Sequence, residues 1–80
     1  MVERLTGKKV VGFKQSIKAI QNGSVNAVYL ANDAEARLIE KIVELCEENS
    51  LEVHYVDTMK DLGKLCGIDV GAASAVILKE

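Results

Sequence analysis

The sequence predicts an α/β protein, a three-layer α/β/α sandwich in which helices cover both faces of a four-stranded mixed sheet. The main observation is that short apolar runs alternate along the chain with segments whose apolar residues recur at helical spacing. The chain has 80 residues, 49% of them hydrophobic and 28% charged, which fits one folded domain over residues 1–80. Proline is absent, so Gly, Asn, Asp and Ser have to form the turns.

The N-terminal part of the chain predicts a strand, a helix and a second strand. Residues 10–11 form a short apolar run that ends at Gly12. Apolar residues at helical spacing follow, and the Asn-Gly pair at 22–23 is a typical helix end. The run 26–32 is compact and apolar and predicts a buried strand.

The central part of the chain predicts a long helix and a third strand. Asp33 is expected to cap a helix over 34–49. The apolar stripe of this helix consists of Leu38, Ile42, Leu45 and Cys46. Alternation over 51–56 then predicts a strand that places Tyr55 on the same face as Val53.

The C-terminal part predicts a short helix, a loop and a last strand. Thr58 and Asp61 have the spacing of a capping box. One face of the helix would consist of Met59, Leu62, Leu65 and Cys66. Small residues over 62–67 are expected to bring this helix close to a strand, and the run 74–80 forms the final strand. Residues 2–6 could add a helical turn at the N-terminus.

The net charge of −2 is unevenly distributed. Residues 1–18 carry five basic residues and one acidic residue, whereas residues 32–57 carry eight acidic residues and two basic ones. This pattern predicts a basic face and an acidic face, and a basic face attracts a phosphate backbone even when the total charge is negative. A mixed soluble surface is the alternative interpretation.

Candidate catalytic and metal-binding residues are few. Cys46 and Cys66 lie on apolar faces, which indicates free buried thiols in a reducing, cytoplasmic compartment rather than a disulfide or a thiol nucleophile. His54 is the single histidine, on an alternating strand, and no Cys-x-x-Cys motif or histidine pair is present. We therefore expect no enzyme activity, no metal and no cofactor.

The segment from Gly12 to Lys18 has the features of a phosphate-binding helix start. A glycine at a strand-to-helix junction lets another backbone approach closely, and first-turn amides favour phosphate. Lys14 and Lys18 share one helix face, and Gln15 carries a donor and an acceptor that suit a base edge. An ordinary amphipathic helix with solvated lysines explains the same pattern.

The loop over 67–74 is glycine-flanked and unusually apolar. Ile68 and Val70 are candidates for exposure, where apolar side chains would cover unpaired bases. A tight turn that places both side chains under the sheet is equally consistent with the sequence.

Three segments, GFKQSIKAIQNG, VYLANDAE and VDTMKDLGKLCGIDVGAASA, together resemble the L7Ae/L30e family of ribosomal proteins, whose members bind kink-turn RNA. The resemblance extends from Gly12 to about Leu78 and is closest to the short bacterial YbxF-type members. It implies the α/β/α sandwich, binding to RNA with tandem sheared G·A pairs, and no catalysis.

The resemblance also implies roles for individual residues. Gly12 matches the junction glycine of the family, Lys18 its phosphate-contacting lysine, and Asp33 an acidic residue that is structural or supports the site from behind. The loop residues match the loop that covers a flipped-out nucleotide. The implied RNA-binding residues are Gly12, Phe13, Lys14, Gln15, Lys18, Asp33, Ile68, Asp69, Val70, Gly71 and Ala72.

Lys14 and Gln15 depart from the family pattern, because the strong binders carry Asn and Glu at these positions. A glutamate accepts two hydrogen bonds from a guanine, whereas a neutral amide accepts through one oxygen, and charge-assisted bonds are stronger. We expect this chain to bind kink-turn RNA more weakly than those strong binders, by about 1–3 kcal/mol of binding free energy, which is the range for losing one base contact. A different RNA target is the alternative.

The hypothesis that follows is a monomeric RNA-binding domain whose partner is ribosomal RNA or another structured RNA, with Lys8 and Lys9 as additional phosphate contacts. The alternative is a protein-interaction module that uses the acidic helix over 34–49 to bind a basic ribosomal protein or enzyme. A small hydrolase or thiol enzyme would need a catalytic pair that this pattern does not indicate.

Overall fold

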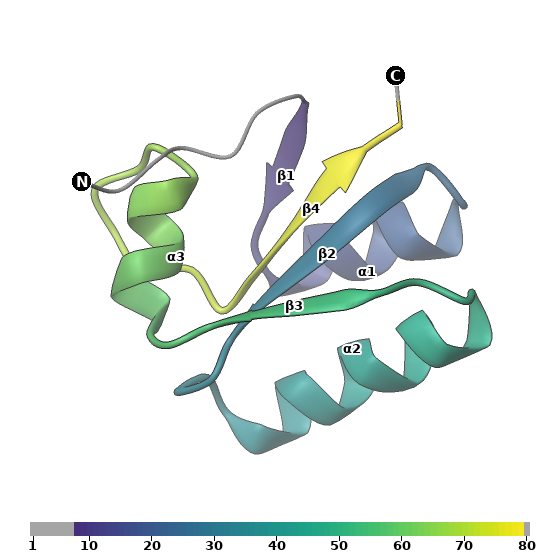
Figure 1. The fold of residues 1–80 in the computed structure, drawn as a ribbon, viewed down its shortest axis with the longest axis horizontal. Helices are drawn as coiled ribbons and strands as arrows, with labels where there is room; N and C mark the ends of the chain where they lie inside the picture. The colour runs from purple at the N-terminus through teal and green to yellow at the C-terminus, as the bar shows by residue number, and fades with distance from the viewer. Residues whose placement is uncertain (1–7, 80) are drawn as a thin grey trace.

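The computed structural model describes residues 8–79 and has the predicted α/β/α architecture (Figure 1). The predicted helical turn over 2–6 lies outside these residues. Strands and helices alternate along the chain as β1 (Lys9–Val11), α1 (Phe13–Gln21), β2 (Val25–Ala31), α2 (Ala36–Glu48), β3 (Val53–Val56), α3 (Met59–Leu65) and β4 (Ser74–Leu78). Among the described residues, no helix is long and apolar enough to cross a bilayer.

The four strands form one mixed sheet in the order β1-β4-β2-β3. β4 lies between β1 and β2 and is antiparallel to both, whereas β2 and β3 are parallel and α2 provides the crossover between them. The C-terminal ends of β1, β2 and β3 and the N-terminal end of β4 therefore meet at one edge of the sheet. The two segments predicted from the sequence to bind RNA, Gly12 to Lys18 and the loop over 67–74, adjoin this edge.

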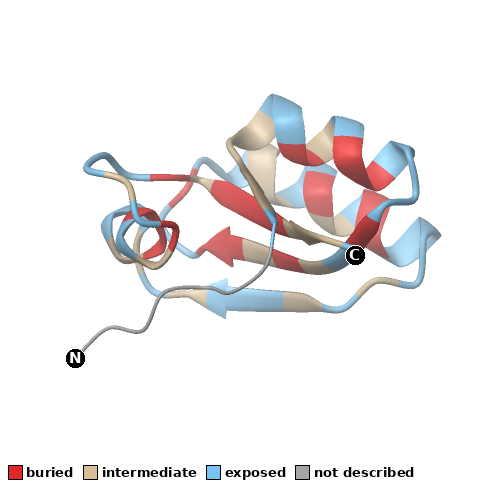
Figure 2. Ribbon diagram, turned by 90° about the horizontal axis from the view of Figure 1, so that it is seen from above, coloured by how far each residue is buried: buried red, intermediate tan, exposed pale blue. Residues whose placement is uncertain are grey.

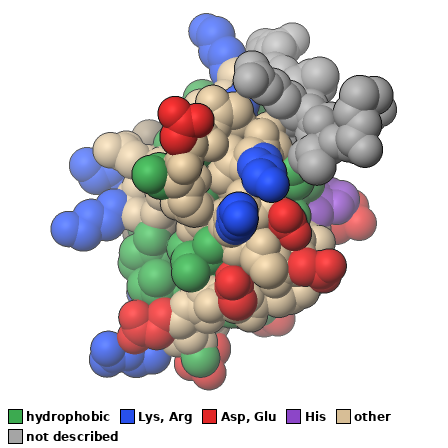
Figure 3. Space-filling view, turned by 90° about the vertical axis from the view of Figure 1, so that its left-hand side faces the viewer, with side chains coloured by type: hydrophobic (Ala, Val, Ile, Leu, Met, Phe, Trp, Pro, Cys, Tyr) green, Lys and Arg blue, Asp and Glu red, His purple; other side chains and the backbone are tan. Residues whose placement is uncertain are grey.

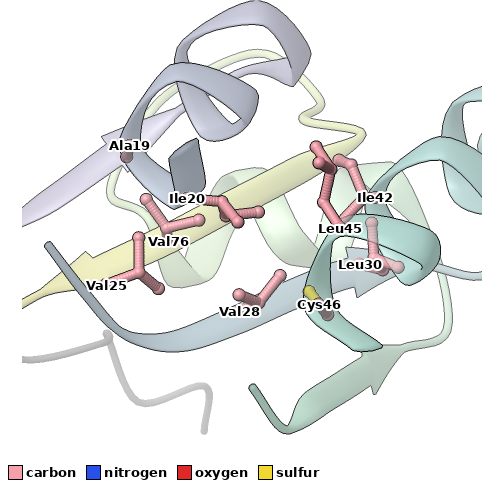
Figure 4. Packing of buried hydrophobic residues seen from close by; sticks show 9 residues of the cluster. All are labelled: Ala19, Ile20, Val25, Val28, Leu30, Ile42, Leu45, Cys46 and Val76. Carbon is pink, nitrogen blue, oxygen red and sulfur yellow. The ribbon is translucent and has the colours of Figure 1, made fainter. Parts of the chain in front are cut away.

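Helices cover both faces of the sheet, as predicted (Figure 2). Helices α1 and α2 pack on one face, where Ile20, Ile42 and Cys46 meet Val28 and Leu30 of β2 (Figure 4). Helix α3 packs on the other face. Its cluster consists of Ala31, Ala34, Leu62, Cys66, Ala72 and Ala75. Successive residues of β2 serve opposite clusters because side chains alternate across a strand.

The predicted cap of α2 by Asp33 is wrong. Helix α2 begins only at Ala36, and its N-cap residue Glu35 makes no side-chain cap hydrogen bond. Asp33 instead accepts a hydrogen bond from the backbone N–H of Met59, at 2.7 Å. Because β2 and β3 run parallel, the residues after both strands lie at the same edge, and the N–H at the start of α3 lies within hydrogen-bond distance of Asp33.

Helix α3 keeps its predicted cap but not all of its predicted buried face. The Thr58 hydroxyl accepts a hydrogen bond from the Asp61 N–H at 3.0 Å, which confirms this cap, and Leu62 is buried. Met59 is 37% exposed, because it is the first residue of α3 and lies at the edge of the sheet where β2 and β3 end. Tyr55 lies on the face predicted for it but is 55% exposed, since β3 is an edge strand.

Candidate nucleic-acid interface

Gly12 joins β1 to α1 in a conformation that only glycine adopts readily. Its φ is 109° and its ψ 155°, and a Cβ there would meet no described heavy atom within 4 Å, so backbone strain alone disfavours other residues. Its N–H donates to the carbonyl oxygen of Ser74 at 2.9 Å, and its own carbonyl accepts from the Ser16 N–H at 2.9 Å. This junction fixes the first turn of α1 against the start of β4.

A buried serine pair reinforces the same connection. The Ser16 hydroxyl donates to the Gly12 carbonyl at 2.6 Å and lies 3.0 Å from the Ser74 hydroxyl, and both serines are fully buried. Neither serine is among the site residues predicted from the sequence. The available signal was a serine on the apolar side of the helix, four residues after a glycine, where its hydroxyl needs a partner.

The first turn of α1 presents polar groups to solvent. Lys14 and Gln15 are exposed, and Lys18 is exposed one turn further along, so the shared face predicted for the two lysines exists. Phe13 is half-buried against the cluster beneath α1 and α2. No described side chain caps this helix, so its first amides keep the positive end of the helix dipole open to a ligand.

In the loop between α3 and β4, one of the two apolar candidates is exposed and the other is not. Val70 is 69% exposed, whereas Ile68 is half-buried and packs on the cluster under α3. Asp69 and Gly71 are exposed. Ala72 is buried, and its N–H donates to the Met59 carbonyl at 3.0 Å. The loop thus offers one apolar side chain at its tip and holds its other apolar residues inside.

Gly63 determines how closely this loop lies on α3. A Cβ at Gly63 would overlap the carbonyl oxygen of Val70, and a Cβ at Gly71 would lie 3.2 Å from the Met59 Cβ. The small residues of this region were expected to bring a helix close to a strand. In the structure, Gly63 brings the helix close to the loop instead, so α3 and the loop form one packed unit.

The two predicted segments are therefore neighbours at one edge of the sheet. Figure 3 views the molecule from the side of α3 and shows basic side chains at the left edge and near the centre of this face, with apolar side chains exposed between them. Lys8 and Lys9 stand apart from this edge, because they precede Gly12 by the length of β1, about 10–13 Å. Acidic side chains lie mainly along the lower and right margins of the view.

The described residues hold no assembled catalytic or metal centre. The two thiols lie in different clusters, and burial raises the pKa of both Cys46 and Cys66, although the charge of Lys9 partly opposes this shift at Cys66. The His54 ring stacks on Tyr29 with 5.0 Å between ring centroids. No group of three potential metal ligands occurs within residues 8–79.

Comparisons with known proteins identify relatives along nearly the whole chain. The model of the ribosomal protein L7Ae/L30e/S12e/Gadd45 family matches residues 2–80. The chain is 53% identical over 75 residues to RNA-binding protein TTE2299 of Caldanaerobacter subterraneus, covering 94% of this chain and 92% of that protein. It is 45% identical over 73 residues to RNA-binding protein YbxF of Geobacillus stearothermophilus, covering 91% and 89% respectively.

More distant similarities extend to ribosomal proteins and to solved structures. Large ribosomal subunit protein eL8 of Halobacterium salinarum is 33% identical over 78 residues, which is 96% of this chain and 65% of that protein. The fold superposes on the 15.5kD RNA binding protein of Giardia lamblia with a TM-score of 0.84 at 22% identity, covering 90% of this chain and 61% of that one. At this identity the superposition supports the fold alone.

Proposed function

We propose that this protein, which belongs to the ribosomal protein L7Ae/L30e/S12e/Gadd45 family, binds structured RNA with a sharp kink and sheared G·A pairs. It acts as a monomeric, non-catalytic domain in the cytoplasm. The relatives named RNA-binding proteins support RNA as the ligand class. The observation that carries the proposal is the contact between Gly12 and Ser74, which holds the start of α1 beside the loop of residues 67–73.

Phosphate binding is assigned to the start of α1. The first-turn amides and the exposed ammonium groups of Lys14 and Lys18 point to an anion with several oxygens, and the RNA backbone supplies a row of them. Lys8 and Lys9 can reach only more distant phosphates, because β1 separates them from Gly12. Phosphate contacts of this kind fix the register of the RNA without reading its sequence.

Base recognition is assigned to Gln15 and to the loop tip. Base edges of a regular RNA duplex are hard to reach, so sequence-specific contacts fall on unpaired or irregular bases. Gln15 would accept and donate at a guanine edge of a sheared pair, and the exposed Val70 would pack on a base turned out of the stack. The half-buried Ile68 and the buried Ala72 support the loop from beneath, and Asp69 and Gly71 form its exposed turn.

The two contact areas favour bent RNA over straight RNA. They lie at one edge of the sheet and belong to different elements, so an RNA that folds sharply around this edge touches both. Binding energy from these contacts would then offset the cost of bending. The exposed acidic residues of α2 would repel phosphate and restrict the RNA to the side of α1 and the loop.

The salt dependence of binding tests this proposal. Lys18→Ala should weaken binding to every RNA and reduce the slope of log affinity against log salt by about one, because one phosphate contact is lost. Lys79→Ala is the matched control, since Lys79 is exposed at the opposite end of β4 from Ser74. An affinity that does not change between low and moderate salt, or an equal loss for both variants, would contradict the proposal.

A further inference from the structure

Asp33 is an acidic residue at the edge where the proposed RNA phosphates would lie. It follows β2 by two residues, and Ala31 at the end of β2 donates its N–H to Ala73 in the loop before β4, at 3.0 Å. The side chain is exposed, so by charge alone it would repel RNA. Contact with RNA therefore does not explain an acidic residue at this position.

The structure provides that reason in a hydrogen bond across the edge. One oxygen of the Asp33 carboxylate accepts the N–H of Met59 at 2.7 Å. Met59 is the first residue of α3, so this N–H has no partner within the helix. A carboxylate at a helix N-terminus also interacts favourably with the helix dipole. Asp33 therefore fixes the first turn of α3 from a different element.

Met59 transmits this constraint to the loop. Its carbonyl oxygen accepts the N–H of Ala72 at 3.0 Å, and Gly71 packs directly against its side chain and backbone. One turn further on, Gly63 is packed against the carbonyl group of Val70. The first turn of α3 thus holds the loop at Ala72, the next turn holds it at Val70, and Asp33 holds the first turn.

We propose that Asp33 is a positioning residue for RNA binding, which sets the loop of residues 67–73 through the backbone of Met59 and does not contact RNA. This inference rests on the proposed function. It specifies the structural or supporting role that the resemblance implies for Asp33, by naming the N–H of Met59 as the group that its carboxylate holds, and it removes Asp33 from the RNA-contacting residues. The acceptor oxygen is what fixes the turn, and the negative charge favours the start of α3 but repels RNA phosphates.

Two variants separate the acceptor from the charge. Asp33→Ala removes both, and the positioning role predicts RNA affinity about threefold to tenfold weaker, the range expected when one helix cap is lost. A purely electrostatic role predicts the opposite sign, because a repulsive charge is removed. Asp33→Asn keeps an oxygen acceptor without the charge and should bind more tightly than Asp33→Ala.

The measurement is calorimetric titration of each folded variant with a kink-turn RNA at several salt concentrations, well below the midpoint of thermal unfolding. The salt slope for Asp33→Ala should equal that of the wild type, because no phosphate contact is lost. Asp57→Ala is the matched control, since it removes an exposed acid next to α3 that accepts none of the described hydrogen bonds. It should bind as tightly as the wild type or more tightly.

The outcomes separate this inference from the proposed function. Wild-type protein that binds no RNA would contradict the proposed function itself. Wild-type binding together with an unchanged or tighter Asp33→Ala would overturn the positioning role, as would Asp33→Asn that is as weak as Asp33→Ala. If Asp33→Ala does not fold, Thr58→Ala tests the same first turn by removing its other cap, and unchanged affinity there would also overturn the inference.

Discussion

At the scale of single residues, the proposed interface combines a fixed backbone with two side chains, Lys14 and Gln15, that depart from the pattern expected from the resemblance. Gly12 and the pair Ser16 and Ser74 fix the start of α1, and their buried hydroxyls have partners. Lys14 and Gln15 occupy exposed positions on the turn that they fix. A change of side chain at either position should therefore alter binding without altering the fold.

Gln15→Glu tests the proposed contact to a base edge. A carboxylate offers two acceptor oxygens to the N1–H and N2–H of a guanine, and charge-assisted hydrogen bonds are about twice as strong as neutral ones. We expect the variant to prefer an RNA with sheared G·A pairs over a mutated pair by about 1–3 kcal/mol more than the wild type does. Competition titration with the two RNAs measures this difference.

Gln21→Glu is a matched control, because Gln21 is an exposed glutamine in the last turn of the same helix and also gains one negative charge. It should leave the preference unchanged. Flat selectivity in Gln15→Glu would show that this side chain does not read a base.

At the scale of elements, the sequence predicted most of the fold because its local signals agree with the tertiary structure. The Thr58 cap, the glycine ends at Gly23 and Gly67, and the buried runs of β2 and β4 all depend on short-range chemistry. Asp33 was assigned to the wrong helix, because local spacing cannot reveal that a parallel strand pair brings the start of a later helix within its reach. The serine pair was missed for the same reason, since 58 positions separate its members.

Gly63→Ala tests whether α3 and the loop act as one unit. Alanine is favoured over glycine within a helix by about 1 kcal/mol, so a neutral site would become more stable. Here the new methyl group would overlap a backbone oxygen of Val70, and we expect destabilisation by about 1–3 kcal/mol together with weaker RNA binding. Denaturant unfolding and RNA titration measure the two effects.

Gly23→Ala is the comparison, because its Cβ would meet no described heavy atom within 4 Å and only its φ of 74° opposes the change. It lies at the far end of α1 and should reduce stability without changing RNA affinity. A Gly63→Ala protein that is more stable than the wild type would mean that the loop does not pack on α3 as described.

At the scale of the whole molecule, each of the two apolar clusters contains one thiol, so the alkylation rate of that thiol measures how well its cluster is packed. Burial raises the pKa of Cys46 and of Cys66, so little of either thiol is ionised at neutral pH and native-state alkylation should be slow. Cys66 should react before Cys46, because it is less completely buried and the nearby charge of Lys9 favours its thiolate. Both rates should rise with pH as the thiolate fraction grows.

Mass spectrometry of partially alkylated protein measures the order of modification, and unfolded protein in denaturant gives the reference rate for each thiol. Equal rates in the folded and unfolded states, or modification of Cys46 first, would contradict the described packing of the two clusters.

The charge pattern of the sequence predicted the arrangement of charges on the whole molecule only in part. A basic and an acidic face were expected, but α1 and α2 lie side by side on the same face of the sheet, so their charges adjoin. The proposed site is therefore defined less by net charge than by the meeting of strand ends at one edge. That meeting follows from the sheet order, which the local pattern of the sequence does not determine.

The most direct test of the proposed function is a calorimetric titration of the wild-type protein with a kink-turn RNA and with a straight duplex of matched length and composition. Because we propose that a sharply bent RNA touches both the start of α1 and the loop of residues 67–73, we predict that the kink-turn binds at least about tenfold more tightly. Equal affinity for the two RNAs at moderate salt would contradict the proposal that this edge grips a kink.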